Sequence, residues 1–178
     1  MESFKELYDQ HHKKVFNIAL NIVHHIEDAE DIVQEVFVEV HRSQHLFKEE
    51  SAAFTWIYRI TVNKSLDFLR AKKSKKRFAF LTGLFDRETG EQLHEVSHFD
   101  HPGVELEKKE RTQILFKAID TLPENQRAAF VLTQIEQFTQ KEAAAIMNVG
   151  EKAVESLIQR AKANLRKELG NLYNNRRI

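Results

Sequence analysis

Helix-breaking residues are rare in this sequence, and apolar residues recur along it at helical spacing. The chain of 178 residues contains two prolines and five glycines. In the stretch DAEDIVQEVFVEV, residues 28–40, apolar side chains follow one another at steps of three, one, three, one and three, which is the spacing of one buried helical stripe. The stripe consists of Ala29, Ile32, Val33, Val36, Phe37 and Val40. The pattern predicts an all-α fold.

The same periodicity predicts seven helices in two groups. They span Phe4–His24, Asp28–Ser43, Ser51–Lys75, Val104–Asp120, Glu124–Glu136, Gln140–Met147 and Glu151–Leu169. Residues 77–103, between the groups, hold three of the five glycines and lack a helical stripe. A connection of that length is unusual inside one compact domain, so we expect a flexible linker between small helical domains at residues 1–76 and 104–178. The linker's first part, residues 78–85, is more apolar than a free tether, and we expect it to pack against the domains or a regulator.

Composition excludes several classes of protein. Apolar residues make up 42% of the chain and charged residues 30%, which favours a packed core over disorder. Cysteine is absent, so disulfides, cysteine-based zinc sites and cysteine nucleophiles are excluded. The N-terminal stretch MESFKELYDQ has no apolar signal region, and no apolar run reaches membrane-spanning length. We therefore expect a soluble cytoplasmic protein without direct membrane insertion.

The net charge of zero hides an alternation of acidic and basic blocks. Residues 1–50 hold five basic and eleven acidic residues, whereas residues 51–80 hold eight basic residues and one acidic residue. Residues 81–110 are again acidic, and residues 151–178 are again basic. The alternation indicates that different segments bind different partners.

The stretch FTQKEAAAIMNVGEKAVESLIQRAKANLRKEL is typical of a helix-turn-helix. Thr139 and Glu142 form a capping box at a helix start. A tight turn at Asn148–Gly150 leads into a second helix. That helix is expected to bury Val154, Leu157, Ile158, Ala161, Leu165 and Leu169. In such motifs the second helix enters the DNA major groove, and its N-terminal part meets base edges. The base-edge candidates are Lys152, Glu155, Ser156 and Gln159.

An ordinary surface helix with a solvated polar face is the alternative to DNA binding here. The capping box, the tight turn and the basic second helix together favour the DNA-binding motif. Arg160 has an alternative role as well, because a pair with Glu142 across the motif would serve only the fold.

The stretch FTWIYRITVNKSLDFLRAKKSKKR, residues 54–77, joins aromatic residues to a basic stripe. The stripe consists of Arg59, Lys64, Arg70, Lys72, Lys73, Lys75, Lys76 and Arg77. Aromatic side chains beside a basic groove are typical of proteins that hold unstacked single-stranded bases. The alternative is that Phe54, Trp56 and Tyr58 belong to the core.

Four segments, in this order, resemble the bacterial extracytoplasmic-function (ECF) sigma factors of the sigma-70 superfamily. They are DAEDIVQEVFVEV, FTWIYRITVNKSLDFLR, LPENQRAAFVL and FTQKEAAAIMNVGEKAVESLIQRAKANLRK. The resemblance implies a promoter-specificity subunit of RNA polymerase. Its first domain, a region 2-like helical bundle, recognises and helps to melt the −10 element. Its second domain, a region 4-like helix-turn-helix, binds the −35 element as duplex.

The resemblance also implies three sets of binding residues. The set for core polymerase, which docks on the β′ coiled coil, is Asp28, Asp31, Gln34, Glu35 and Val38. The set for −10 DNA is Trp56, Arg59, Asn63, Lys64, Arg70 and Lys73, with the Ser43–Ala53 loop capturing an extruded base. The set for −35 DNA is Gln140, Lys141, Lys152, Glu155, Ser156, Gln159 and Arg160.

The implied partners are core RNA polymerase, through its β′ coiled coil and β flap, promoter DNA and an anti-sigma factor. No catalytic residue, metal, cofactor or small-molecule substrate is implied, because binding energy opens the DNA. The chain departs from the family in its recognition helix. Many members carry Gly-Thr before the helix valine and a basic residue after it, whereas this chain has Lys152 and Ala153 before Val154 and Glu155 after it.

Two other classes of protein are rival interpretations. A helix-turn-helix transcriptional regulator that acts without core polymerase would share only the C-terminal motif. A carboxylate-bridged metal enzyme would use the side shared by Asp28, Asp31 and Glu35, but such sites need inward Glu-x-x-His pairs, and the pair Glu91 to His94 lies in the linker. Most of the nine histidines are expected at the surface.

Overall fold

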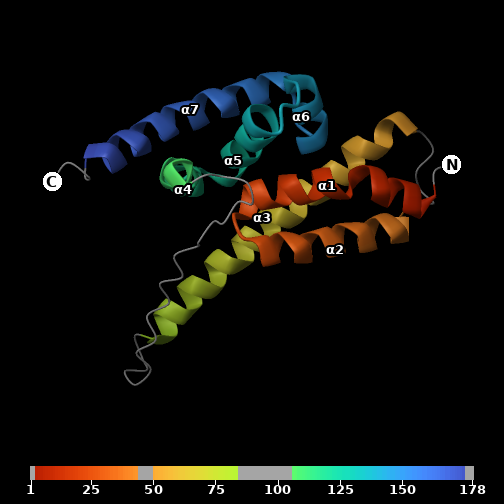
Figure 1. The fold of residues 1–178 in the computed structure, drawn as a ribbon, viewed down its shortest axis with the longest axis horizontal. Helices are drawn as coiled ribbons and strands as arrows, with labels where there is room; N and C mark the ends of the chain where they lie inside the picture. Colours follow the sequence, from red (N-terminus) through yellow and green to blue (C-terminus); the bar gives the residue numbers. More distant parts are fainter. Residues whose placement is uncertain (1–2, 44–49, 84–105, 175–178) are drawn as a thin grey trace.

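The computed structural model describes residues 3–43, 50–83 and 106–174, and it confirms the predicted all-α fold (Figure 1). The elements are α1 (Phe4–Val23), α2 (Ile26–Ser43), α3 (Glu50–Gly83), α4 (Leu106–Asp120), α5 (Glu124–Phe130), the π-helix η2 (Val131–Ile135), α6 (Gln140–Met147) and α7 (Glu151–Asn174). Helices α1–α3 are called the N-terminal domain below, and α4–α7 the C-terminal domain. Within the described ranges, no helix is both long enough and apolar enough to cross a membrane.

The N-terminal domain is a bundle in which α1, α2 and α3 all pack on one another. The predicted stripe of α2 faces the core. Ala29, Ile32, Val36, Phe37 and Val40 are buried, and Val33 is partly buried. Helix α1 begins with a capping box in which the backbone N–H of Ser3 donates to Glu6 Oε2 at 2.7 Å. Local capping and one apolar stripe per helix therefore account for this bundle.

Helix α3 is longer than the sequence predicts. It continues to Gly83, past the expected end at Lys75, and its last turns extend away from the bundle (Figure 1). Phe78 is 69% exposed on this extension, and the side chains of residues 79–85, the rest of the apolar segment expected to pack against the domains or a regulator, lie outside the described residues. Residues 44–49 and 84–105 lie outside the described residues, and they include most of the predicted base-capture loop and most of the predicted linker.

The C-terminal domain contains one feature that helical periodicity did not predict. The expected single helix Glu124–Glu136 is divided into α5 and η2. In η2 the backbone N–H of Glu136 donates to the carbonyl of Val131 at 2.9 Å, which is the five-residue spacing of a π-helix. Gln137, with φ of 62°, then turns the chain into α6. The wider π turn places Glu136 and Phe138 toward the N-terminal domain, where both make contacts described below.

The two domains lie against each other along two seams. Helix α3 packs on α6, and α1 packs on η2, so that α5 and α6 lie over the bundle (Figure 1). Buried apolar side chains of both domains form one continuous cluster. The relation between the domains therefore depends on side chains far apart in the sequence.

Truncation of the α2 stripe provides a test of this packing. The Ile32 side chain is 3% exposed, so Ile32→Ala is expected to lower the free energy of unfolding by about 2–5 kcal/mol. Val38 on the same helix is 50% exposed, and Val38→Ala should change the free energy of unfolding by no more than about 0.5 kcal/mol. Chemical denaturation of both variants measures the difference, and equal losses would contradict the assignment of the buried face.

Candidate polymerase and nucleic-acid interfaces

Helix α2 presents an acidic face on the side opposite its buried stripe. Four of the five predicted polymerase-binding residues are exposed there, namely Asp31, Gln34, Glu35 and Val38. The fifth, Asp28, is half-buried, and its Oδ2 accepts from Lys72 Nζ at 3.1 Å. A face that combines carboxylates with an exposed valine suits a basic protein surface with some apolar character.

Cations of α3 already neutralise part of this face. Lys64 Nζ lies 3.1 Å from Glu35 Oε2, and Lys72 pairs with Asp28. Exposed ion pairs of this kind contribute about 0–1 kcal/mol each, so a stronger partner displaces them at small cost. Of the three carboxylates in the predicted set, Asp31 is the one with no ion pair among the described residues.

The predicted −10 residues on α3 do not share one open surface. Asn63 and Lys73 are exposed, whereas Trp56 is half-buried and packs against the core. The two arginines contact the C-terminal domain. Arg59 Nη2 donates to the carbonyl of Ala145 at 2.7 Å, and Arg70 Nε donates to Glu124 Oε2 at 2.6 Å. Of the three aromatic residues weighed as stacking platforms or core, Tyr58 is buried and Phe54 is half-buried.

The helix-turn-helix has the predicted local chemistry. Thr139 Oγ1 accepts from the backbone N–H of Glu142 at 3.2 Å, and Glu142 Oε2 accepts from the backbone N–H of Thr139 at 2.8 Å. These hydrogen bonds hold the pKa of Glu142 below its usual value. Asn148, with φ of 55°, ends α6 in the left-handed conformation. Glu142 is thus engaged in the cap and not in a pair with Arg160.

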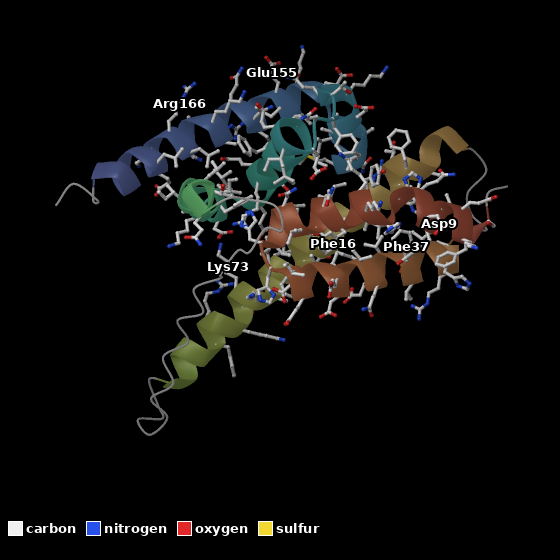
Figure 2. All side chains as sticks on the ribbon, in the orientation of Figure 1. Asp9, Phe16, Phe37, Lys73, Glu155 and Arg166 are labelled. Atoms are coloured by element: carbon white, nitrogen blue, oxygen red, sulfur yellow. The ribbon has the colours of Figure 1, made fainter. Side chains whose placement is uncertain are left out.

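Helix α7 buries one face and exposes the predicted recognition face. Val154, Ile158, Ala161 and Leu165 are buried, and Leu157 and Leu169 are partly buried. Lys152, Glu155, Gln159 and Arg160 are exposed, as are Gln140 and Lys141 at the start of α6. Ser156 is half-buried and accepts from Arg160 Nη2 at 2.7 Å. Figure 2 shows Glu155 and Arg166 on the side of α7 that faces away from the other helices.

A polar cluster between the domains was missed by the sequence interpretation. Most histidines were expected at the surface, and no role was predicted for His24, which is 2% exposed. Its Nδ1 lies 2.9 Å from Asp120 Oδ1, and its Nε2 lies 2.9 Å from the carbonyl of Asn21. Arg127, 6% exposed, donates to the carbonyl of Ile22 at 3.0 Å. His24 ends α1 in the left-handed conformation. A histidine in the sequence does not by itself specify that conformation, so the sequence contained no local signal for this cluster.

Within the described ranges, no group of three or more His, Cys, Asp or Glu side chains lies at a spacing that would hold a metal ion.

Comparison with known proteins places both domains in the same family. The Sigma-70 region 2 family model matches residues 7–75, and the Sigma-70, region 4 model matches residues 112–165. The ECF RNA polymerase sigma-E factor of Escherichia coli (strain K12) is 34% identical over 137 residues, which are 76% of this chain and 70% of that protein. The RNA polymerase sigma-H factor of Pseudomonas aeruginosa is 28% identical over 167 residues, which are 94% of this chain and 86% of that protein.

Two solved structures share the fold. The sigma factor RpoE from Bartonella quintana, in complex with the anti-sigma factor NepR, is similar with a TM-score of 0.65 at 21% identity, over 94% of this chain and 96% of that chain. CnrH, in complex with the cytosolic domain of CnrY, is similar with a TM-score of 0.63 at 23% identity, over 94% of this chain and 88% of that chain.

Tyr58 reports on the contact between the domains. Burial, together with the negative charge of Glu136, raises the pKa of the Tyr58 phenol to about 12. Because the folded-state pKa is raised, the contribution of Tyr58 to stability is fully present below about pH 10 and is lost as the pH rises toward 12. Absorbance titration of wild type minus Tyr58→Phe isolates this phenol.

Glu136→Gln is expected to lower the pKa of Tyr58 toward 10, because Glu136 comes from the C-terminal domain and carries the second cause of the shift. Glu151→Gln removes an exposed carboxylate of the same domain that is no cause of the shift, so it serves as the matched control. A Tyr58 pKa unchanged by Glu136→Gln would contradict the described contact.

Proposed function

Because this chain belongs to the extracytoplasmic-function sigma factors of the sigma-70 family, we propose a role for each of its surfaces in transcription initiation. Members of the family bind core RNA polymerase and direct promoter-specific initiation, and this chain is such an initiation factor. It recognises the −35 element as duplex and melts and captures the −10 element. No step of this role requires a catalytic residue of the chain, because binding energy opens the DNA.

The observation that supports this assignment most is the separation of charge between surfaces. An acidic face lies on α2, while cationic side chains lie on α3 and along the outer face of α7. A regulator that bound only DNA would have no use for an exposed acidic helix in the same bundle as a basic one. A subunit that joins a basic polymerase surface to DNA needs both.

For core polymerase, the docking face consists of Asp31, Gln34, Glu35 and Val38, with Asp28 at its edge. An arginine-rich coiled coil of the β′ subunit would make bidentate, charge-assisted hydrogen bonds to the carboxylates. Engagement of Asp28 and Glu35 would release Lys72 and Lys64 from their present pairs. Polymerase binding would thereby increase the positive charge that α3 offers to DNA.

For −10 DNA, Asn63 and Lys73 are the contacts that are already exposed. Arg59, Lys64 and Arg70 join them once their present partners are exchanged for phosphates. Trp56 is half-buried, so it would contact DNA only with its exposed edge. Trapping of an unstacked base, which offsets about a few kcal/mol of unstacking cost, is assigned to the 43–53 loop, most of which lies outside the described residues.

For −35 DNA, α7 enters the major groove and presents Lys152, Glu155 and Gln159 to base edges, with Ser156 held by Arg160. Gln140 and Lys141, at the N-terminus of α6, would contact the phosphate backbone. Glu155 repels phosphates unless it accepts from an amino group, and cytosine offers one in the major groove. This inference gives Glu155 a role in sequence preference.

An anti-sigma factor is the proposed regulator. The similar structure of RpoE is a complex with the anti-sigma factor NepR, and this chain has the same fold. The proposed place of action is the cytoplasm, where bacterial RNA polymerase meets promoter DNA, and the β flap is the proposed second contact on the polymerase.

In vitro transcription tests the function as a whole. Purified chain, core polymerase and a pool of genomic DNA fragments are expected to give discrete start sites with a shared pair of upstream elements. Core polymerase alone is the control. Start sites identical with and without the chain would overturn the assignment.

Charge reversal at two positions distinguishes a specific docking face on α2 from an effect of the chain's overall negative charge. Asp31→Lys is expected to weaken assembly with core polymerase at least tenfold, because it places like charge against a basic partner. Asp9→Lys changes the same charge at an exposed position on α1 and should leave assembly within about twofold of wild type. Fluorescence titration with labelled chain measures both affinities. Equal effects of the two reversals would argue against the α2 face.

Substitutions on α7 separate base reading from phosphate binding. Glu155→Ala is expected to change the preferred −35 sequence, with a discrimination of about 1–3 kcal/mol lost at one base pair. Lys162→Ala, at an exposed position about two turns further along the same side of α7, should weaken binding to all sequences alike and reduce the salt slope by about 0.9. Selection of binding sites from a randomised duplex, followed by salt titration, distinguishes these outcomes. A uniform loss for Glu155→Ala would contradict its role.

A further inference from the structure

We propose that His24 is a buried proton-binding site that makes the junction between α1 and the C-terminal domain sensitive to pH. The inference is independent of the proposed role in transcription, because it concerns only how the end of α1 is joined to α4 and α5. It rests on the hydrogen-bond partners of the two ring nitrogens and on the charged groups around the ring.

The ring of His24 lies where the end of α1 meets α4. His24 ends α1 in the left-handed conformation, with φ of 59°, and its backbone N–H donates to the carbonyl of Leu20 at 2.8 Å. The side chain is 2% exposed, and its ring packs on the ring of Phe116 from α4, with centroids 4.5 Å apart. Groups of both domains therefore fix the position of the ring.

Both nitrogens of this ring face hydrogen-bond acceptors. Nδ1 of His24 lies 2.9 Å from Asp120 Oδ1, and Nε2 lies 2.9 Å from the carbonyl oxygen of Asn21. A backbone carbonyl can only accept, and near neutral pH an aspartate is ordinarily ionised and can also only accept. Two N–H groups are needed to satisfy both contacts, and only the imidazolium form of histidine has two. The geometry thus fits a ring that holds a bound proton.

The charged groups around the ring come from three helices. Asp120 of α4 attracts a positive ring, whereas Arg127 of α5 repels it, since Arg127 Nη1 lies 3.1 Å from the same Asp120 oxygen. His25, the next residue in the chain, has its Nδ1 3.6 Å from Asp28 Oδ2 of α2. Burial also disfavours a charged ring. The two hydrogen bonds and the Asp120 carboxylate act against these effects, so specific contacts hold the proton.

Loss of the proton would break one of the two contacts. A neutral imidazole has one N–H, so either Nδ1 would turn a lone pair toward Asp120 or Nε2 would turn one toward the Asn21 carbonyl. In the first case α1 and α4 lose a hydrogen bond and gain a repulsion. In the second case a carbonyl in the last turn of α1 loses its donor. Either change leaves the end of α1 less firmly held.

Other contacts between the domains involve no histidine. Asn21 Nδ2 donates to Glu136 Oε1 of η2 at 2.7 Å, and Lys14 Nζ lies 2.8 Å from Glu136 Oε2. Lys14 Nζ also lies 4.9 Å from the centroid of the Phe138 ring. Lysine and glutamate ordinarily keep their charges near neutral pH. These contacts are therefore expected to hold one side of the junction while the His24 side responds to pH.

Linkage gives the sign of the response. The joined arrangement binds the proton through two hydrogen bonds that a separated arrangement lacks, so the junction is favoured at low pH and weakens as the pH rises. Histidine is the side chain that ordinarily changes charge between about pH 5 and 8. The domain arrangement would thereby follow the pH of the surroundings.

The distance between the domains as a function of pH tests the proposal. Nitroxide labels at Lys13→Cys on α1 and Ala163→Cys on α7 occupy exposed positions in a chain without other cysteines. Pulsed dipolar spectroscopy is expected to give a narrow distance distribution at about pH 5.5 and one at least about twofold broader at about pH 8.5, on either side of the range in which histidine ordinarily titrates. The same width at both pH values would overturn the proposal.

His24→Asn separates the titration from the contact. Asparagine tolerates the left-handed conformation, and its amide can donate to Asp120 without titrating. The labelled chain with His24→Asn should therefore give the same width at both pH values. Broadening that survives this substitution would assign the effect to another group and overturn the role of His24.

His11→Asn is the matched control on the same helix. His11 Nδ1 lies 3.0 Å from the hydroxyl oxygen of Tyr58, which can donate or accept and so suits the ring in either form. The chain with His11→Asn should still broaden at the higher pH. Loss of the broadening in this control would transfer the pH response from His24 to His11.

Nitrogen NMR observes the proton directly and does not depend on how a variant folds. In a chain whose histidines carry the heavy nitrogen isotope, the His24 signals are those that disappear in His24→Asn or that correlate with the Phe116 ring protons. Both ring nitrogens should be protonated at the lower pH, and one should lose its proton over the range in which the distance distribution broadens. A neutral His24 ring in a chain with a narrow distribution would overturn the proposal.

Discussion

The burial of Arg127 between the domains is the contact on which the rest of the arrangement depends. Its guanidinium bonds the end of α1 on one side and Asp120 on the other, and so places α5 over the N-terminal bundle. Once α5 is held there, Glu124 reaches Arg70, and α6 lies beside Arg59. Two of the proposed DNA contacts are thus positioned by a residue that lies outside the proposed binding sets.

Acidic and basic side chains of the N-terminal domain pair with each other in the free protein. The net charge is zero, yet acidic and basic faces lie within one bundle, and α3 lysines pair with α2 carboxylates. Such pairs are weak in water, so they keep the free protein neutral locally without preventing binding. A basic partner that binds the α2 carboxylates would release the α3 lysines that now pair with them. The released lysines would then be available to DNA phosphates, so polymerase binding would favour DNA binding by electrostatics alone.

Local patterns predicted most of the fold and part of the site. The stripe of α2, the Thr139 capping box and the turn at Asn148 depend on residues a few positions apart, and all three are confirmed. Burial of His24 against Asp120 and the contact of Arg59 with Ala145 were not predictable in this way, because they join residues 96 and 86 positions apart and depend on how the domains meet. The π turn of η2 also escaped, since it preserves the apolar pattern of an α-helix.

Distance measurement between the domains tests the central claim, that the Arg127 contact holds them together in the free protein. Spin labels at Lys13→Cys on α1 and Ala163→Cys on α7 occupy exposed positions in a chain with no other cysteine. Pulsed dipolar spectroscopy should give one narrow distance for the free protein and a broader distribution for the same labelled chain with Arg127→Ala. A broad distribution with Arg127 present, or an unchanged narrow distance with Arg127→Ala, would contradict the claim.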